Sequence, residues 1–278
     1  MPDRQIDRPA ADREAGGRGF AAAVLPVGAQ AIHTDAAGLL AGPVSIPVGD
    51  LQMPAYRAAP AGGRHLPVVL VASEIFGVHE HIADVCRRLA RQGYLAIAPE
   101  LFVRHGDAGA CTDIPRLIAE VVAQAADAQV HGDLDATVAW AAAQGGDTAR
   151  LGITGFCWGG RMAWSYAAHS AAVKAAVAWY GPVARNYCAG DSTVIERAAS
   201  IRAPVLGLYG AADGGIPVET LGALEATLQA AGTGRCEFVV YPDTPHAFFA
   251  DYRPSYRRAE AEDAWARGLR WLRRHGVA

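Results

Sequence analysis

Cysteine is scarce in this sequence, and its five residues are poorly spaced for cross-linking. Their number is odd, and no two of them form a Cys-x-x-Cys motif. Neither a disulfide framework nor a zinc site is therefore expected, and the pattern favours a reducing compartment, the cytoplasm. Long apolar runs are also lacking, since none reaches the roughly 18 residues that suggest a membrane-spanning helix.

An excess of positive charge is absent as well. The formal net charge is −3, and acidic residues interrupt the arginines that gather near the C-terminus, which is typical of a solvated helix face. Nucleic acid is not an expected partner, because its phosphates require a clustered basic surface. The sequence has no P-loop and no Gly-x-Gly-x-x-Gly motif, so we expect no cofactor and no metal.

The first 41 residues are interpreted as an extension that precedes the catalytic domain. Residues 1–19 are polar and rich in glycine, which favours a disordered leader. Residues 20–27 are apolar and lead to small residues at 29–31 that resemble the cleavage site of an export signal. The apolar stretch is short, and acidic residues precede it. Periplasmic or secreted location is the alternative if residues 1–31 act as a signal.

The remaining chain, residues 42–278, predicts one α/β domain. Hydrophobic residues make up 51% of the sequence, which is enough for a sizeable core. Extended runs on both sides of Gly49-Asp50 indicate an antiparallel hairpin. Beyond it, apolar runs alternate with helical periodicity, the pattern of a mostly parallel twisted sheet with helices on both faces. We expect hairpin strands at 43–48 and 53–58, further strands at 66–72, 94–98, 150–155, 173–180, 205–209 and 236–241, and helices at 81–92, 114–128, 134–143, 161–168, 217–231 and 254–274.

The most informative segment is Gly155-x-Cys157-x-Gly159, between a predicted strand and a predicted helix. The same arrangement with serine is the nucleophile elbow of α/β-hydrolases. Its glycines remove side chains that would collide where the helix folds back over the strand. The turn raises Cys157 above the carboxyl edge of the sheet, and the positive end of the helix favours a thiolate. A buried structural cysteine is the alternative.

An acid and a base follow at the ends of two later strands. Asp213 comes after the apolar run at 205–209, and His246 lies in the loop after the run at 236–241. The order nucleophile, acid, histidine is that of α/β-hydrolases, which favours catalysis over a structural cysteine. We therefore expect His246 to pair with the thiol of Cys157 and later protonate the leaving group, while Asp213 orients the imidazole.

Other polar residues compete for these roles. Asp243, three residues before the histidine, is the main rival for the acid. His79, His81 and His105 lie near the same end of the predicted sheet and could line a pocket. The sequence places no acid at a suitable strand end for any of the three.

These motifs resemble the dienelactone hydrolase family of α/β-hydrolases. Three segments carry the likeness: Glu-Ile-Phe-Gly at 74–77, Gly-x-Cys-x-Gly at 155–159 and Pro-His-Ala-Phe at 245–248. The likeness spans about residues 42–272, and the first two motifs together are much more specific than either alone. It implies a hydrolase of small esters or lactones that acts through an acyl-cysteine intermediate. The implied substrate is dienelactone, 4-carboxymethylenebut-2-en-4-olide.

The resemblance also gives Glu74 a role. In the family, a buried glutamate at this place holds the cysteine as a neutral thiol at rest, and takes the thiol proton when substrate displaces it. The residues alone already make Glu74 unusual, because a carboxylate that ends a buried strand is costly unless it is protonated or paired. A helix-capping or salt-bridged glutamate is the alternative.

Further site residues are implied by the same likeness. The backbone N–H groups of Ile75 and Trp158 match the oxyanion hole. Arg104 matches the arginine that binds a substrate carboxylate, a task that suits a guanidinium. Three more side chains are candidates for substrate binding: Phe76, Tyr180 and Arg253.

Two positions depart from the family pattern. Members active on dienelactone carry an arginine four residues after the histidine, where this chain has Ala250 and its nearest arginine is Arg253. Ala247 stands where a serine is familiar. Both changes weaken the case for a dianionic substrate. A broader carboxylesterase or thioesterase is therefore the first alternative, and a non-catalytic redox-sensing or ligand-binding protein is the second.

Overall fold

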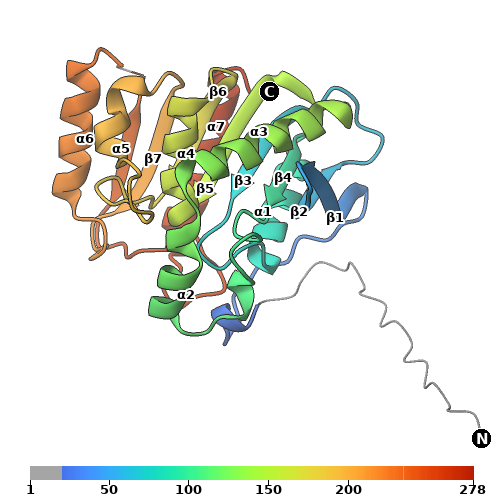
Figure 1. The fold of residues 1–278 in the computed structure, drawn as a ribbon, viewed down its shortest axis with the longest axis horizontal. Helices are drawn as coiled ribbons and strands as arrows, with labels where there is room; N and C mark the ends of the chain where they lie inside the picture. The colour runs from blue at the N-terminus through green and yellow to red at the C-terminus, as the bar shows by residue number, and fades with distance from the viewer. Residues whose placement is uncertain (1–20, 234) are drawn as a thin grey trace, which may run out of the picture.

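Eight strands form a single sheet in the computed structural model, which describes residues 21–233 and 235–278 (Figure 1). Residues 1–20 lie outside the described residues; they comprise the predicted leader, 1–19, and the first residue of the apolar stretch at 20–27 of the candidate export signal. The strands are β1 Leu39–Val48, β2 Leu51–Pro60, β3 Pro67–Ala72, β4 Leu95–Pro99, β5 Asp147–Phe156, β6 Val173–Trp179, β7 Val205–Gly210 and β8 Glu237–Tyr241.

The strand order is β1-β2-β4-β3-β5-β6-β7-β8. Strand β2 pairs antiparallel with both β1 and β4, whereas every pair from β4 to β8 is parallel. The prediction of a mostly parallel sheet with an N-terminal antiparallel hairpin is confirmed. Every residue of β3 and β4 is buried, because both are short apolar runs in the middle of the sheet. Strand β1 begins at Leu39, ahead of the expected domain boundary at residue 42.

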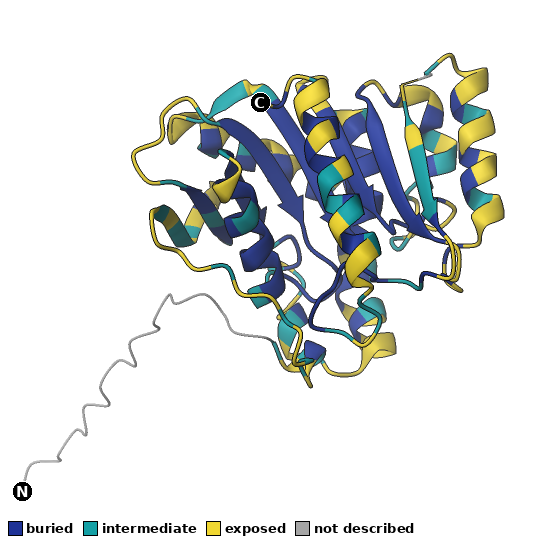
Figure 2. Ribbon diagram, turned by 180° about the vertical axis from the view of Figure 1, so that it is seen from behind, coloured by how far each residue is buried: buried dark blue, intermediate teal, exposed yellow. Residues whose placement is uncertain are grey.

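Helices cover both faces of the sheet. Helices α1 and α7 pack on one face, against β2 and β4 and against β6 and β7, while α3 and α4 pack on the other face (Figure 1). Seen from behind, the strands are buried between helices whose outer faces are exposed (Figure 2). The helices are α1 Glu80–Arg91, α2 Ile114–Glu120, α3 Asp127–Ala143, α4 Trp158–His169, α5 Val194–Arg197, α6 Val218–Ala230 and α7 Arg258–Arg274. Short 3-10 helices cover Ala22–Val24, Ala108–Ala110, Val122–Gln124 and Ala198–Ser200.

The expectation of one helix over 114–128 was wrong. Helix α2 ends at Glu120, a 3-10 turn follows, and α3 starts anew at Asp127. The carboxylate of Asp127 is buried and accepts two hydrogen bonds from Arg161 of α4, at 2.6 and 2.9 Å. This ion pair fixes where α3 begins. The alanine-rich sequence alone cannot show it, because the two partners lie far apart in the chain.

The segment before β1 lies along the domain. The backbone N–H of Gly28 donates to the carbonyl of Tyr252 at 2.8 Å, and that of Thr34 donates to the Asp84 carboxylate at 2.5 Å. Part of the predicted N-terminal extension is thus hydrogen-bonded to α1 and to the loop that follows β8. Within the described residues, no helix is both long enough and apolar enough to cross a membrane.

Candidate active site

Cys157 occupies the tight turn between β5 and α4. It is the N-cap residue of α4, with φ 54° and ψ −115°, a backbone conformation that non-glycine residues rarely adopt. A Cβ on Gly155 would lie 2.0 Å from the carbonyl oxygen of Gly159, and a Cβ on Gly159 would lie 2.2 Å from that of Ala72. The steric reason that the sequence suggested for these two glycines is confirmed. Backbone strain of this kind clusters at functional sites.

Gly159→Ala is expected to destabilise the protein by at least about 2 kcal/mol, because the new methyl group collides with backbone that cannot move aside. Urea unfolding followed by circular dichroism measures the change. Gly222→Ala is the matched control, since Gly222 lies inside α6 with open space around it. That substitution should raise the free energy of unfolding by up to about 1 kcal/mol. Equal effects at the two positions would contradict the steric explanation.

Asp213 and His246 meet directly. Asp213 follows the end of β7, His246 follows the end of β8, and Nδ1 of the imidazole lies 2.6 Å from Oδ2 of the carboxylate. Their loops touch through backbone: a Cβ on Gly210 would lie 2.1 Å from the carbonyl of Thr244, and that carbonyl accepts a hydrogen bond from Ala212 at 3.0 Å. The missing side chain at position 210 therefore lets the acid and the base approach each other.

The imidazole of His246 also reaches the cysteine. Burial works against its charged form, but hydrogen bonds with Asp213 and with Cys157 outweigh burial and raise the pKa of His246 to about 10. Because Nδ1 faces a carboxylate, it carries a proton, which leaves Nε2 for the sulfur. The structure thus brings together the three residues that the sequence grouped. The aromatic ring of Tyr180 packs edge-on against the imidazole, with ring centres 5.1 Å apart.

The rivals named from the sequence lie elsewhere or bind other partners. Asp243 is an exposed turn residue with φ 52°. His105 pairs with the side chain of Gln129 at 2.7 Å. The sequence analysis predicted no acid partner for His79 or His81, and this prediction was wrong. His79 lies 3.3 Å from a carboxylate oxygen of Glu74, described next, and His81 lies 3.4 Å from Asp251.

Glu74 is buried just beyond the end of β3, as expected, but its contacts differ from those that the resemblance implies. One oxygen lies 3.3 Å from Nε2 of His79, and the other accepts a hydrogen bond from the Tyr252 hydroxyl at 3.5 Å. Burial alone would raise the pKa of Glu74, but the hydrogen bond and charge of His79, helped by His81 and Arg253, lower it to about 2. Glu74 is therefore a paired carboxylate.

The two candidate arginines differ in their surroundings. Arg253 lies beside two aromatic rings: its guanidinium carbon is 4.9 Å from the centre of the Phe76 ring, and its Nε donates to the Tyr252 hydroxyl at 3.2 Å. Arg104 instead pairs with Asp133 of α3 at 2.5 Å. Its charge is thus already matched by a carboxylate. Arg253 is the better placed of the two to meet a substrate close to Glu74.

The predicted oxyanion donors lie where the prediction puts them in the chain. Trp158 is the first residue of α4, where a backbone N–H has no partner inside the helix. Ile75 follows Glu74 in the buried loop after β3. The indole of Trp158 is buried against Phe102, with ring centres 4.5 Å apart, which fixes the start of the helix. Both N–H groups follow strands of the sheet that are direct neighbours.

The sequence analysis did not name two tyrosines that lie near the candidate site. Burial and the neighbouring Cys157 raise the pKa of Tyr187 to about 12, so its half-buried phenol lies near the sulfur. Arg185 packs over the Tyr187 ring at 4.8 Å. Tyr252 binds Glu74 as described. Both tyrosines lie in loops after strand ends, and position in such loops was the only signal that the sequence offered.

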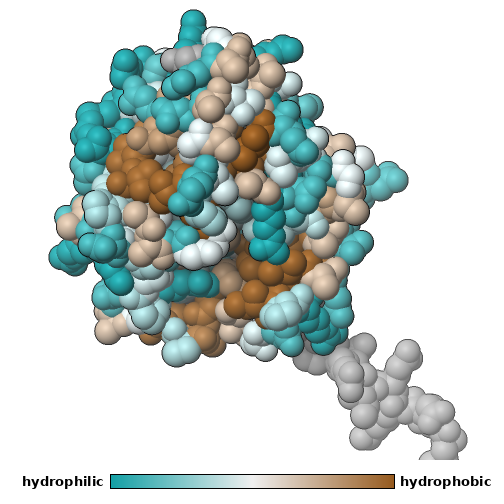
Figure 3. Space-filling model, turned by 90° about the vertical axis from the view of Figure 1, so that its left-hand side faces the viewer, coloured by the Kyte–Doolittle hydropathy of each residue, from teal (hydrophilic) through white to brown (hydrophobic). Residues whose placement is uncertain are grey.

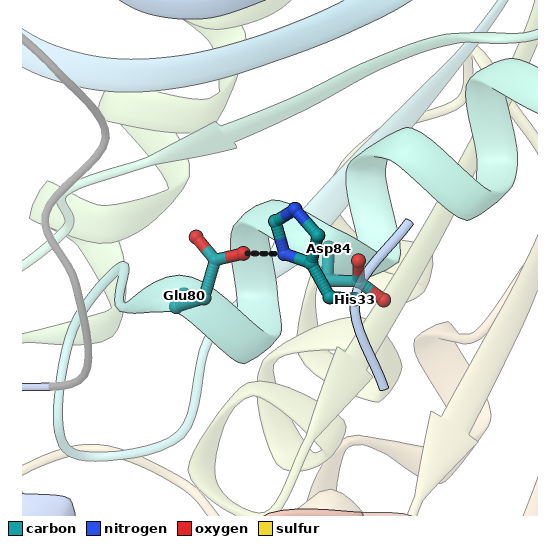
Figure 4. Close-up of side chains that lie close together, drawn as sticks. All are labelled: His33, Glu80 and Asp84. Atoms are coloured by element: carbon teal, nitrogen blue, oxygen red, sulfur yellow. Dashed lines mark hydrogen bonds and ion pairs between the residues drawn. The ribbon is translucent and has the colours of Figure 1, made fainter. Parts of the chain in front are cut away.

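One group of side chains has the composition of a metal site. His33, Glu80 and Asp84 lie close together, with the imidazole 3.0 Å from Glu80 (Figure 4). Arginines already use both carboxylates: Arg87 pairs with Glu80 and with Asp84, and Arg88 lies 2.5 Å from Asp84. Arginine nitrogens thus lie against both oxygens of Asp84 and one oxygen of Glu80. The group is better explained as an ion-pair network that fastens the N-terminal segment to α1.

A separate cleft of about 450 Å³ lies between α7 and strands β7 and β8. Leu206 and Glu237, which line it, lie at the starts of these parallel strands, whereas Asp213 and His246 follow their ends. The cleft is therefore at the opposite edge of the sheet from Cys157. On the side of the molecule that carries α6, apolar side chains form separate patches among hydrophilic ones (Figure 3).

A mostly parallel sheet, with a cysteine on a strained turn and an acid and a histidine after later strands, defines an α/β-hydrolase. Comparison with known proteins narrows this class. The sequence model of the dienelactone hydrolase family matches residues 53–276, so the chain belongs to that family and is a hydrolase.

Close relatives agree with this assignment. A Methylorubrum extorquens protein named "Putative carboxymethylenebutenolidase" is 57% identical over 94% of this chain and 90% of its own length. An Escherichia coli K12 protein of the same name is 49% identical over 93% of this chain and 96% of its own length. The crystal structure of a "Putative Dienelactone Hydrolase" from Klebsiella pneumoniae has a TM-score of 0.81 and 52% identity, and covers 84% of this chain and 98% of that one.

Proposed function

We propose that the protein hydrolyses a small ester or lactone with Cys157 as nucleophile, His246 as base and acid, and Asp213 as the group that orients the imidazole. One observation carries the proposal: a single imidazole hydrogen-bonds to the carboxylate at 2.6 Å and to the cysteine on the strained turn. Such a cysteine, imidazole and carboxylate chain is the arrangement that activates a sulfur nucleophile.

Acylation follows from this geometry. The thiol proton of Cys157 moves to His246, and the sulfur attacks the carbonyl carbon of the substrate. Negative charge then develops on the carbonyl oxygen, where the backbone N–H groups of Ile75 and Trp158 can stabilise it. As the tetrahedral intermediate collapses, the C–O bond breaks and the imidazolium protonates the leaving oxygen. In a lactone this oxygen stays attached to the acyl chain, because the broken bond is part of a ring.

Deacylation reverses the roles of the groups. The neutral imidazole of His246 takes a proton from water, and the resulting hydroxide attacks the thioester carbon. The C–S bond breaks, and the sulfur leaves as a thiolate beside the imidazolium. One water is consumed for each ester or lactone bond. Asp213 supports both halves because it fixes the tautomer and stabilises the protonated ring.

The substrate class is proposed from the relatives' names and from Arg253. Carboxymethylenebutenolidase names the hydrolysis of dienelactone, a lactone that carries a carboxylate. A guanidinium that stacks on Phe76 beside Glu74 is suited to bind such a carboxylate at the rim of the site. Arg253 would then serve in place of the arginine that is missing at position 250.

Arg253→Gln is expected to raise KM for dienelactone at least about tenfold, because a charge-assisted hydrogen bond to the substrate contributes roughly 1.5–3 kcal/mol. KM for the neutral ester p-nitrophenyl acetate should change less than about threefold, since that substrate has no carboxylate to bind. Arg104→Gln is the matched control, because Asp133 already pairs with Arg104. If Arg104→Gln gave the larger rise with dienelactone, the carboxylate site would be at position 104.

A broader carboxylesterase is the second candidate, and Ala250 is the observation that favours it. An alanine at this buried position lacks the positive charge of the arginine that family members active on dienelactone carry there. Values of kcat/KM for dienelactone and for p-nitrophenyl acetate separate the two candidates. We expect dienelactone to be the better substrate, and a large preference for the simple ester would replace the first candidate by the second.

A further inference from the structure

The N-terminal segment, residues 21–34, is fixed to α1 at its far end. The backbone N–H of Thr34 donates to the carboxylate of Asp84 at 2.5 Å, and the carbonyl of Thr34 accepts a hydrogen bond from Nε of Arg87 at 2.7 Å. The side chains of Asp84 and Arg87 are both buried. Because both backbone groups of Thr34 are bound by buried side chains, this end of the segment has a fixed position.

Earlier in the segment, two donors bind the loop that follows β8. The backbone N–H of Gly28 donates to the carbonyl of Tyr252 at 2.8 Å, and Nε2 of Gln30 donates to the carbonyl of Arg253 at 3.2 Å. The two carbonyls belong to consecutive residues of the loop. The segment therefore holds the backbone of Tyr252 and Arg253 at two successive peptide groups.

The side chains of this pair extend to residues of the candidate site. The hydroxyl of Tyr252 lies 3.5 Å from a carboxylate oxygen of Glu74, and the guanidinium carbon of Arg253 lies 4.9 Å from the centre of the Phe76 ring. Nε of Arg253 also donates to the Tyr252 hydroxyl at 3.2 Å. A displacement of the backbone at these two residues would therefore move the guanidinium relative to Glu74 and Phe76.

The beginning of the segment lies next to the loop that carries Phe76. A Cβ on Gly109 would lie 2.8 Å from Cβ of Ala21 and 3.6 Å from the carbonyl oxygen of Phe76, so Gly109 lies between these two residues. Val24, three residues along the segment, is buried in the core. One segment is thus bound to the loop that carries Arg253 and packed beside the loop that carries the ring on which Arg253 stacks.

We propose that Gly28 and Gln30 are positioning residues, which hold the backbone at Arg253 so that its guanidinium is placed for the carboxylate of the substrate. The proposal rests on the proposed function, because there Arg253 binds that carboxylate. A guanidinium on a long side chain loses conformational freedom when it binds a ligand, and this loss lowers the affinity. A backbone that is fixed beforehand reduces the loss. The segment acts through Arg253, and no contact with the substrate is assigned to it.

Gly28→Pro tests the first of the two bonds, because proline has no N–H to donate to Tyr252. We expect KM for dienelactone to rise about threefold to tenfold, the effect of one lost hydrogen bond, while kcat changes less than about twofold. KM for p-nitrophenyl acetate should also change less than about twofold, since this ester has no carboxylate for Arg253 to bind. Initial rates over a range of concentrations of each ester measure these values.

Ala29→Pro is the matched control. Ala29 is exposed and is the second residue of a turn that the N–H of Ala31 closes on the carbonyl of Gly28 at 3.2 Å. Proline is favoured at the second position of such turns, and here it removes neither of the two bonds to the loop. KM for both esters should remain within about twofold of the wild type. An equal rise in KM for dienelactone in Ala29→Pro and Gly28→Pro overturns the proposal.

Gln30→Ala tests the second bond and keeps the proposal falsifiable if Gly28→Pro fails to fold, which circular dichroism reveals. The side chain of Gln30 is exposed, and its loss removes the donor to the carbonyl of Arg253. The same selective rise in KM for dienelactone is expected, at least about twofold. An unchanged KM in Gln30→Ala, or a rise of the same size with both esters, overturns the proposal.

A double variant separates positioning from general stabilisation of the fold. In Gly28→Pro/Arg253→Gln, or in Gln30→Ala/Arg253→Gln, KM for dienelactone should equal that of Arg253→Gln alone, because the guanidinium to be positioned is gone. A merely structural role for the segment predicts the same further rise in both backgrounds, and such a rise overturns the proposal. If Arg253→Gln alone left KM for dienelactone unchanged, the proposed carboxylate site itself would be wrong, so the two failures are distinguishable.

Discussion

Cys157→Ala is expected to lower kcat/KM for both dienelactone and p-nitrophenyl acetate by at least about four orders of magnitude, because loss of a triad nucleophile removes the covalent pathway. The positive end of α4 and the two backbone donors remain in this variant. They can bind the substrate, but they cannot attack it. Initial rates on both substrates measure the loss, and circular dichroism checks that the turn still folds.

A second cysteine, Cys111, provides the matched control for Cys157→Ala. Cys111 is also partly exposed, and its thiol donates a hydrogen bond to the nearby carbonyl of Asp113 at 3.4 Å. Cys111→Ala should therefore retain the wild-type rate. Acid quenching during turnover should trap an acyl group on the peptide that contains Cys157. If Cys157→Ala kept more than about a hundredth of the activity, a nucleophile other than this sulfur would have to be sought.

The parts of the site that the sequence predicts are those set by local rules. Parallel strands bring their carboxyl ends to one edge of a sheet, so residues that follow three strands are expected to meet there. Gly155 and Gly159 indicate the strained turn, because only glycine fits where two backbone segments approach so closely. The meeting of Cys157, His246 and Asp213 was thus predictable from order and spacing.

The parts that escaped prediction depend on partners distant in the chain. Arg104 pairs with Asp133 of α3, a partner that the sequence analysis did not name. The break in the helix expected over 114–128 is set by the pair of Asp127 with Arg161. Glu74 and His79 are only five residues apart, yet their contact requires the loop after β3 to turn back on itself. No local pattern encodes these contacts, because each depends on how whole elements pack.

Asp213→Asn is expected to lower kcat/KM near neutral pH by about two to four orders of magnitude, as loss of the acid does in other triads. The reason is the 2.6 Å hydrogen bond to His246 Nδ1. An amide keeps the shape of the side chain but removes its charge. Without that charge the imidazolium is less stable, and the amide nitrogen can also select the wrong tautomer of the ring.

The pH profile gives this substitution a signature. Hydrogen bonds to Asp213 and Cys157, working against burial, raise the pKa of His246 to about 10, so the protonated ring is lost only as pH rises through that value. The same raised pKa stabilises the fold below about pH 6.5, and this contribution disappears as pH rises from there toward 10. In Asp213→Asn the alkaline limb of kcat/KM should move to lower pH by at least about one unit.

The neighbouring acid tests whether this shift is specific. Asp243→Asn removes an equal charge from an exposed turn three residues before the histidine, and asparagine tolerates the φ of 52° there. Its alkaline limb should coincide with that of the wild type. If instead Asp243→Asn moved the limb and Asp213→Asn did not, the carboxylate that holds the imidazole in solution would be the rival one. The pairing of His246 with Asp213 would then be incorrect, and with it the assignment of the acid.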